Sequence, residues 1–85
     1  MKSNGTPALI PEQIRAARAM LRITAQQLAD RASVGVATVR RAETSDKITY
    51  LNRSTDQAIR RALEEAGVIF LDANGHAGGV ALKRS

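Results

Sequence analysis

Apolar residues recur at helical spacing near the start of the chain. Ile14, Ala17 and Leu21 are three or four residues apart, which places them on one face of a helix. Pro11 suits the first turn of such a helix, because a residue there needs no backbone N–H for the helical hydrogen bonds. The pattern therefore predicts a first helix over residues 11–22.

Two shorter helices are predicted next. Thr24 and Gln27 have the spacing of a capping box, in which each side chain accepts the backbone N–H of the other residue at a helix start. This pair opens a predicted helix over residues 25–32, and another is predicted over residues 36–43 after an interruption at residues 33–35. The positions expected to face inward are small or branched: Leu28, Ala29, Ala32, Val39 and Ala42.

A fourth helix is predicted after a loop over residues 44–53. Ser54 and Gln57 again have capping-box spacing and place the helix start there. Gly67 suits the position beyond the last turn, since glycine readily adopts the left-handed conformation that ends many helices. Two weak ion pairs are expected on the solvated side of this helix: Arg60 with Glu64, and Arg61 with Glu65.

Beyond Gly67 the pattern is that of strands. Residues 68–71 are β-branched, aromatic and aliphatic, residues 72–75 suit a turn, and residues 80–82 suit a second strand, so we expect a short β-hairpin. Alternation along the first strand puts one pair of side chains on each face: Val68 and Phe70 on one, Ile69 and Leu71 on the other.

One face of this hairpin can cover the helices, but nothing in the chain is expected to cover the other. An exposed strand edge also leaves backbone groups unpaired. We therefore predict that the strand formed by Val68, Ile69, Phe70 and Leu71 pairs with the same strand of a second copy, giving a homodimer. The alternative is a hairpin that only covers its own domain.

Length and composition indicate one small domain, and the elements predicted above make it mainly α. The 85 residues are too few for two cores, and an aromatic content of 2% leaves Ala, Leu, Ile and Val to form one. We expect a flexible arm over residues 1–8, a four-helix domain over residues 9–67 and the hairpin tail over residues 68–85. The chain has no cysteine, signal-peptide pattern or membrane-length apolar run, so we expect a cytoplasmic protein with no membrane partner.

The charge favours an anionic partner over catalysis. A net charge of +5, carried mostly by arginine, suits a polyanion, because neutralising phosphates releases condensed counterions. His76 is the single histidine, and the glycine-rich residues 75–79 precede no helix that would form a phosphate site. Glu64 and Glu65 diverge on a helix, so they make no acid–base pair. We expect no enzymatic activity, no metal site and no cofactor.

Residues 24–43, TAQQLADRASVGVATVRRAE, carry a specific resemblance. Two short helices around a tight turn, with a small residue where they cross, make a helix-turn-helix. This segment resembles the lambda repressor/Cro-like helix-turn-helix family. The resemblance covers about residues 14–63 of this chain and follows a five-helix template, whose last helix is absent here. It implies a four-helix lambda repressor-like domain whose second short helix enters the major groove of DNA.

The resemblance also implies roles for individual residues. Arg18 and Glu43 match a partly buried ion pair that ties the first helix to the recognition helix. The residues implied to contact DNA are Gln26, Val36, Ala37, Thr38, Arg40 and Arg41. Arg41 is the best candidate to read a base, since arginine can bond both acceptors of guanine in the major groove.

Three positions depart from the family pattern. Ala25 stands where the pattern prefers glutamine, Ser33 where it prefers glycine, and Gly35 where it prefers a serine or threonine cap. We predict sequence-specific binding of double-stranded DNA by a small transcriptional regulator of the repressor type. The alternative is a protein-binding module of the same fold, such as an antiactivator or an antitoxin-like partner, which the departures favour slightly.

Overall fold

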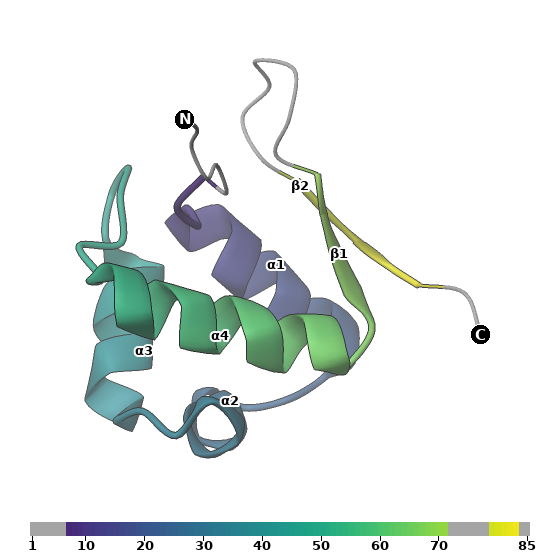
Figure 1. Ribbon diagram of the computed structural model, residues 1–85, viewed down its shortest axis with the longest axis horizontal. Helices are drawn as coiled ribbons and strands as arrows, with labels where there is room; N and C mark the ends of the chain where they lie inside the picture. The colour runs from purple at the N-terminus through teal and green to yellow at the C-terminus, as the bar shows by residue number, and fades with distance from the viewer. Residues whose placement is uncertain (1–6, 72–78, 84–85) are drawn as a thin grey trace.

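The computed structural model describes residues 7–71 and 79–83 and is mainly α, as predicted. Its elements, in chain order, are α1 (Pro11–Leu21), α2 (Ala25–Ala32), α3 (Val36–Thr44), α4 (Arg53–Glu65), β1 (Val68–Leu71) and β2 (Gly79–Leu82). Figure 1 shows α3 and the hairpin on opposite sides of the molecule, with α4 crossing between them. The predicted turn at residues 72–75, His76 and most of the predicted arm lie outside the described residues. In the described part of the chain, no helix has the length and apolar character needed to cross a membrane.

α1 begins where predicted, although Ile10 at its N-cap has no side-chain acceptor. Gln13 makes the other bond of a capping box, because its Oε1 accepts the backbone N–H of Ile10 at 3.0 Å. The helix ends at Leu21, one residue before the predicted end, because Arg22 adopts a left-handed conformation with φ of 58°. Such a residue cannot continue a right-handed helix.

α4 begins at Arg53, so the predicted capping box of Ser54 and Gln57 is wrong. Asn52 is the N-cap instead, and its Oδ1 accepts the backbone N–H of Thr55 at 2.7 Å. Asparagine is among the best N-cap residues, so a cap two positions earlier takes precedence and Ser54 becomes helical. Gly67 follows the helix at φ of +108°, in agreement with its predicted place.

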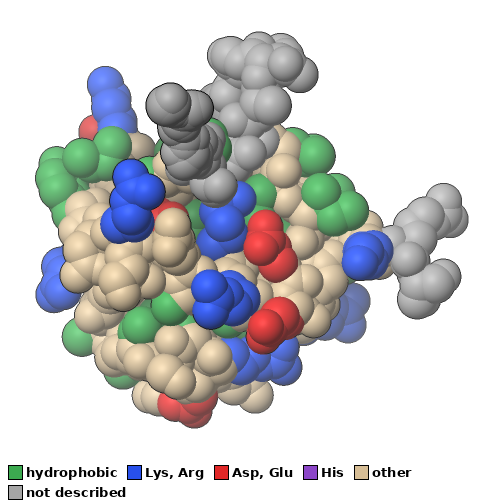
Figure 2. Space-filling model, in the orientation of Figure 1, with side chains coloured by type: hydrophobic (Ala, Val, Ile, Leu, Met, Phe, Trp, Pro, Cys, Tyr) green, Lys and Arg blue, Asp and Glu red, His purple; other side chains and the backbone are tan. Residues whose placement is uncertain are grey.

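Arg60 does not lie on the solvated side of α4 as predicted. Its guanidinium is buried, 4.7 Å from the centroid of the Phe70 ring, and donates to the Pro7 carbonyl at 2.9 Å. The expected partner Glu64 lies 3.9 Å away, at the edge of contact. On the face of the molecule that Figure 2 shows, basic and acidic side chains lie next to one another, so the charge of this face is mixed.

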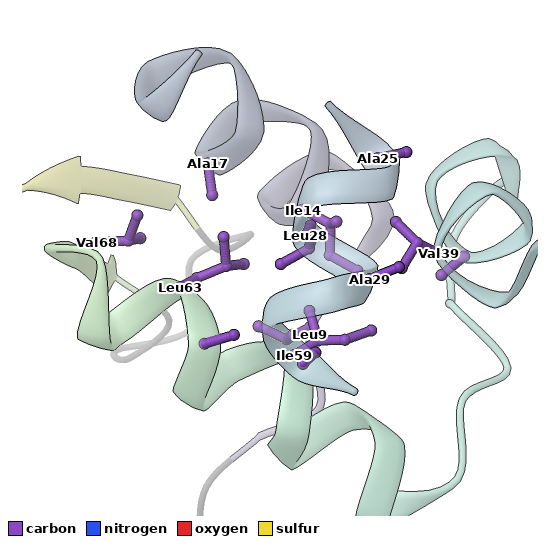
Figure 3. Close-up of a cluster of buried hydrophobic side chains, with 13 residues drawn as sticks. Leu9, Ile14, Ala17, Ala25, Leu28, Ala29, Val39, Ile59, Leu63 and Val68 are labelled. Carbon is purple, nitrogen blue, oxygen red and sulfur yellow. The ribbon is translucent and has the colours of Figure 1, made fainter. Parts of the chain in front are cut away.

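The core is built from aliphatic side chains of all four helices and β1, as Figure 3 shows. α2 packs against α3 and α4, while α1 packs against α3 and β2. Ala29 is fully buried where α2 and α3 approach, which explains why a small residue is needed at that position. The side chains that are almost wholly enclosed include Leu9, Ile14, Leu28, Val39, Ile59 and Leu63.

The hairpin pairs within the chain and covers one end of the helices. Val68 lies opposite Leu82 and Phe70 opposite Val80 in antiparallel register. Val68 is only 3% exposed, and Phe70 and Val80 pack on the core beside it. A hydrogen bond of 3.3 Å from Gln13 Nε2 to the Gly79 carbonyl joins α1 to β2. The inner face of the hairpin is therefore part of the core.

Candidate nucleic-acid interface

The first of the two short helices is fixed at both ends by local chemistry. Thr24 Oγ1 accepts the backbone N–H of Gln27 at 3.0 Å, and Gln27 Oε1 accepts that of Thr24 at 2.9 Å, so the predicted capping box is confirmed. Ser33 ends α2 in the left-handed conformation with φ of 59°. The chain then turns through Val34 and Gly35 into α3.

Ser33 is strained by this conformation, because the Cβ of an L-residue crowds the following carbonyl there. We expect Ser33→Gly to raise the free energy of unfolding by about 0.5–1 kcal/mol, the gain being limited by the greater freedom of glycine in the unfolded chain. The measurement is the urea midpoint at constant m-value. Ser54→Gly, inside α4 at an ordinary helical conformation, is the matched control and should destabilise. An unchanged or lower midpoint for Ser33→Gly would contradict the strain argument.

α3 has a buried side and an exposed side. Val39, Ala42 and Glu43 are buried against the rest of the domain. Of the five residues predicted on this helix to contact DNA, three are exposed: Ala37, Arg40 and Arg41. Thr38 is half-buried, and Val36 is half-buried and packs on the core, so Val36 offers less surface than predicted.

The two exposed arginines are available to a partner. Neither Arg40 nor Arg41 makes a hydrogen bond or ion pair with its side chain inside residues 7–71 and 79–83. With about 100° of rotation per residue, Arg41 projects almost directly away from the buried side and Arg40 projects to one flank. The exposed side of α3 is therefore basic.

Arg18 and Glu43 form a bidentate pair. Arg18 Nε lies 2.6 Å from Glu43 Oε2, and Arg18 Nη2 lies 2.9 Å from Glu43 Oε1. The Glu43 side chain is 7% exposed and that of Arg18 is 27% exposed. The hydrogen bond to Glu43 raises the pKa of the Arg18 guanidinium above its ordinary value, so the group stays charged. Arg18 Nη1 also donates to the Ile23 carbonyl at 2.9 Å, which ties the α1–α2 turn to the pair.

Arg15 was missed by sequence reasoning, which assigned it no role. Its Nη1 donates to the Glu43 carbonyl, while Glu12 lies 4.0 Å from its Nη2. Arg15 precedes Arg18 by three residues, so both side chains emerge from one face of α1. That spacing is the sequence signal that connects Arg15 with the ion pair.

Gln26 lies on the exposed side of α2 and is already engaged. Its Nε2 donates to Asp30 Oδ1 at 2.9 Å, one turn further along the helix. A phosphate contact by Gln26 would therefore compete with this bond, and the Asp30 carboxylate would oppose it. The structure brings Arg18 to Glu43 as predicted, whereas Gln26 is joined to a residue outside the predicted site.

Comparisons with known proteins add no family to this description. A scan against models of protein families finds no match, and a search of curated proteins finds none either. Function must therefore be argued from the residues themselves.

Proposed function

We propose that this protein is a cytoplasmic transcriptional regulator that binds double-stranded DNA sequence-specifically, with α3 in the major groove. The carrying observation is that α3 is anchored on its inner side at Glu43 while its outer side carries two arginines with no partner in the described chain. A helix held in this way can present Arg40 and Arg41 at a fixed angle. The likeness of residues 24–43 to the lambda repressor/Cro-like family supports the same assignment.

The dimensions of α3 suit this role. Its nine residues form an α-helix, which with its side chains is about 10–12 Å across, and the major groove is about 12 Å wide. Ala37 has a small side chain on the exposed side, which allows the backbone to approach the base edges closely. An arginine beside it can donate two hydrogen bonds to a guanine.

The test is binding to a duplex selected by the wild-type protein from a random pool. Arg41→Ala should weaken binding to this duplex by about 1–3 kcal/mol and relax the preference at one base pair. Arg61→Ala on α4 is the matched control, because Arg61 is also exposed and carries the same charge. If both variants lose affinity equally, Arg41 reads no base.

A protein-binding module is the second candidate, because the Asp30 carboxylate lies on the exposed side of α2 beside Gln26. Salt dependence separates the two functions. The logarithm of the affinity for DNA should fall steeply and linearly with the logarithm of the salt concentration, since each phosphate contact releases a counterion. No binding to any duplex at low salt, by a folded protein, would favour a protein partner.

We also propose that the outer face and free edge of the hairpin join two copies. Ile69 and Leu71 remain 43% and 53% exposed. The sheet of the described residues has the order β1-β2, so each strand has one edge without a strand partner among them. A two-fold dimer would present two α3 helices to half-sites about 10 bp apart or a multiple of that spacing.

Lysine substitution tests this dimer. The double variant Ile69→Lys, Leu71→Lys should be monomeric by light scattering where the wild type is dimeric, since two charges on each copy would oppose the contact. Met20→Lys, on α1, replaces another exposed apolar residue and should leave the mass unchanged. A wild-type protein that is monomeric at micromolar concentration would contradict the proposal.

A further inference from the structure

We propose that Arg15 is a positioning residue that sets the orientation of α3 by capping its C-terminus from α1. This inference rests on the proposed function, because its consequence is a change in DNA recognition. Arg15 Nη1 donates to the backbone carbonyl of Glu43, in the last turn of α3. The last four carbonyls of a helix have no partner within it, and a cation near them also interacts favourably with the helix dipole.

Two other carbonyls near this end accept hydrogen bonds from local side chains. Thr44 Oγ1 donates to the Arg40 carbonyl at 3.0 Å, and Ser45 Oγ donates to the Arg41 carbonyl at 2.7 Å. These bonds stay within α3 and its cap, so they stabilise the helix without fixing its place in the domain. The bond from Arg15 is different, because it joins the backbone of α3 to a separate helix.

Arg15 and Arg18 together hold one residue at two points. Arg18 binds the Glu43 carboxylate, and Arg15 binds the Glu43 carbonyl. A side-chain contact alone lets the helix shift while the glutamate rotamer adjusts. A second contact on the backbone removes that freedom, so the pair fixes both the height and the rotation of α3 relative to α1.

Among residues 7–71 and 79–83, no side chain of another element forms an equivalent hydrogen bond at the opposite end of α3, although Val36 packs on the core there. The N-cap of α3 is Gly35, which has no side chain to accept a backbone N–H, and Ser33 before it is in the strained left-handed conformation. The polar contacts that join α3 to α1 therefore lie at its C-terminal end. Arg40 and Arg41 lie three and two residues before Glu43, respectively, so a shift at Glu43 displaces them directly.

A direct phosphate contact is the rival role for Arg15, whose side chain is 47% exposed. The two roles give different salt dependences. Loss of a phosphate contact lowers the log–log salt slope by about 0.9 and weakens binding to every sequence. Loss of a positioning contact leaves the slope and the binding to unrelated DNA unchanged, but reduces discrimination between sequences.

The experiment compares Arg15→Ala with the wild type and with Arg61→Ala as the charge-matched control. Binding is measured over a salt series to the selected duplex and to a mixed-sequence duplex. We expect Arg15→Ala to bind the selected duplex about tenfold more weakly, with mixed-sequence binding and both slopes unchanged. Arg15→Lys, which keeps a donor and the charge, should recover part of the loss. Parallel loss on both duplexes with a shallower slope would overturn the proposal.

Amide hydrogen exchange on the free protein provides a readout independent of DNA. Arg15→Ala should accelerate exchange in the last turn of α3, including the Ser45 amide that bonds the Arg41 carbonyl, more than in α4. Unchanged exchange would overturn the capping role even if DNA binding fell. If the wild type binds no duplex while Arg15→Ala still loosens α3, the proposed function fails but the clamp stands.

Discussion

Arg18→Ala should lower the free energy of unfolding by about 3 kcal/mol, because it leaves the buried Glu43 carboxylate without its cation. Glu43→Ala should cost less, about 1–2 kcal/mol, since the Arg18 guanidinium that it strands is more exposed and keeps its bond to the Ile23 carbonyl. The order of the two effects follows from the unequal exposure of the partners. Urea unfolding followed by circular dichroism measures both.

Glu64→Ala is the control for charge removal, because the Glu64 side chain is 51% exposed and lies 3.9 Å from its partner, at the edge of contact. It should shift the midpoint little. The double variant Arg18→Met, Glu43→Leu should recover most of the stability lost in Arg18→Ala, since apolar residues of similar size can replace a buried pair. Equal effects of Glu43→Ala and Glu64→Ala would mean that the pair contributes nothing beyond its charge.

Truncation after Gly67 should remove a large part of the free energy of unfolding of the helical part. It exposes the surface that Val68, Phe70 and Val80 cover, at a cost of about 3–5 kcal/mol. A domain of this size has only about 4–13 kcal/mol in total. The truncation also removes the Gly79 carbonyl that accepts from the Gln13 side chain and the Phe70 ring that lies against Arg60.

Far-ultraviolet circular dichroism of residues 1–67 at 25 °C measures this loss against the full chain. The variant Ile69→Lys, Leu71→Lys is the control, because it changes the outer face of the hairpin and leaves the inner face intact. A truncated chain with native helicity and a cooperative transition would make the hairpin dispensable. For the same reason, truncation cannot test dimerisation cleanly, whereas the lysine variant can.

The helices were predictable because their signals are local. The capping box of Thr24 and Gln27 and the periodic apolar residues of α2 and α3 depend on spacing within one turn or two. The start of α4 was misplaced because Ser54 and Gln57 have capping-box spacing, whereas the N-cap in the structure is Asn52, two residues earlier. Arg60 was misplaced because its i+4 spacing to Glu64 is also satisfied on the solvated side, whereas Pro7 and Phe70 come from distant segments.

The candidate site was predictable where the resemblance supplied a partner. Arg18 and Glu43 are 25 residues apart, and no periodicity joins them. Arg15 had no counterpart in the pattern, so its contact with a backbone carbonyl became visible only in three dimensions. Ser33 and Gly35 were identified as departures from the family pattern. The structure shows that Ser33 has a positive φ, a conformation in which an L-residue is strained.

The hydrogen bonds that close the N-terminal segment onto the rest of the chain have a consequence for the order of folding. Leu9 N–H donates to Asp56, Arg60 donates to Pro7 and Gln13 donates to Gly79, across 47, 53 and 66 residues respectively. Contacts between residues so far apart form late, because the entropy of closing the loop must first be offset by other contacts. The contact between α1 and β2 therefore forms only after the last strand has been synthesised. Until β2 has emerged from the ribosome, the N-terminal end of α1 lacks one of its partners, and the nascent chain exposes the apolar surface that the hairpin later covers.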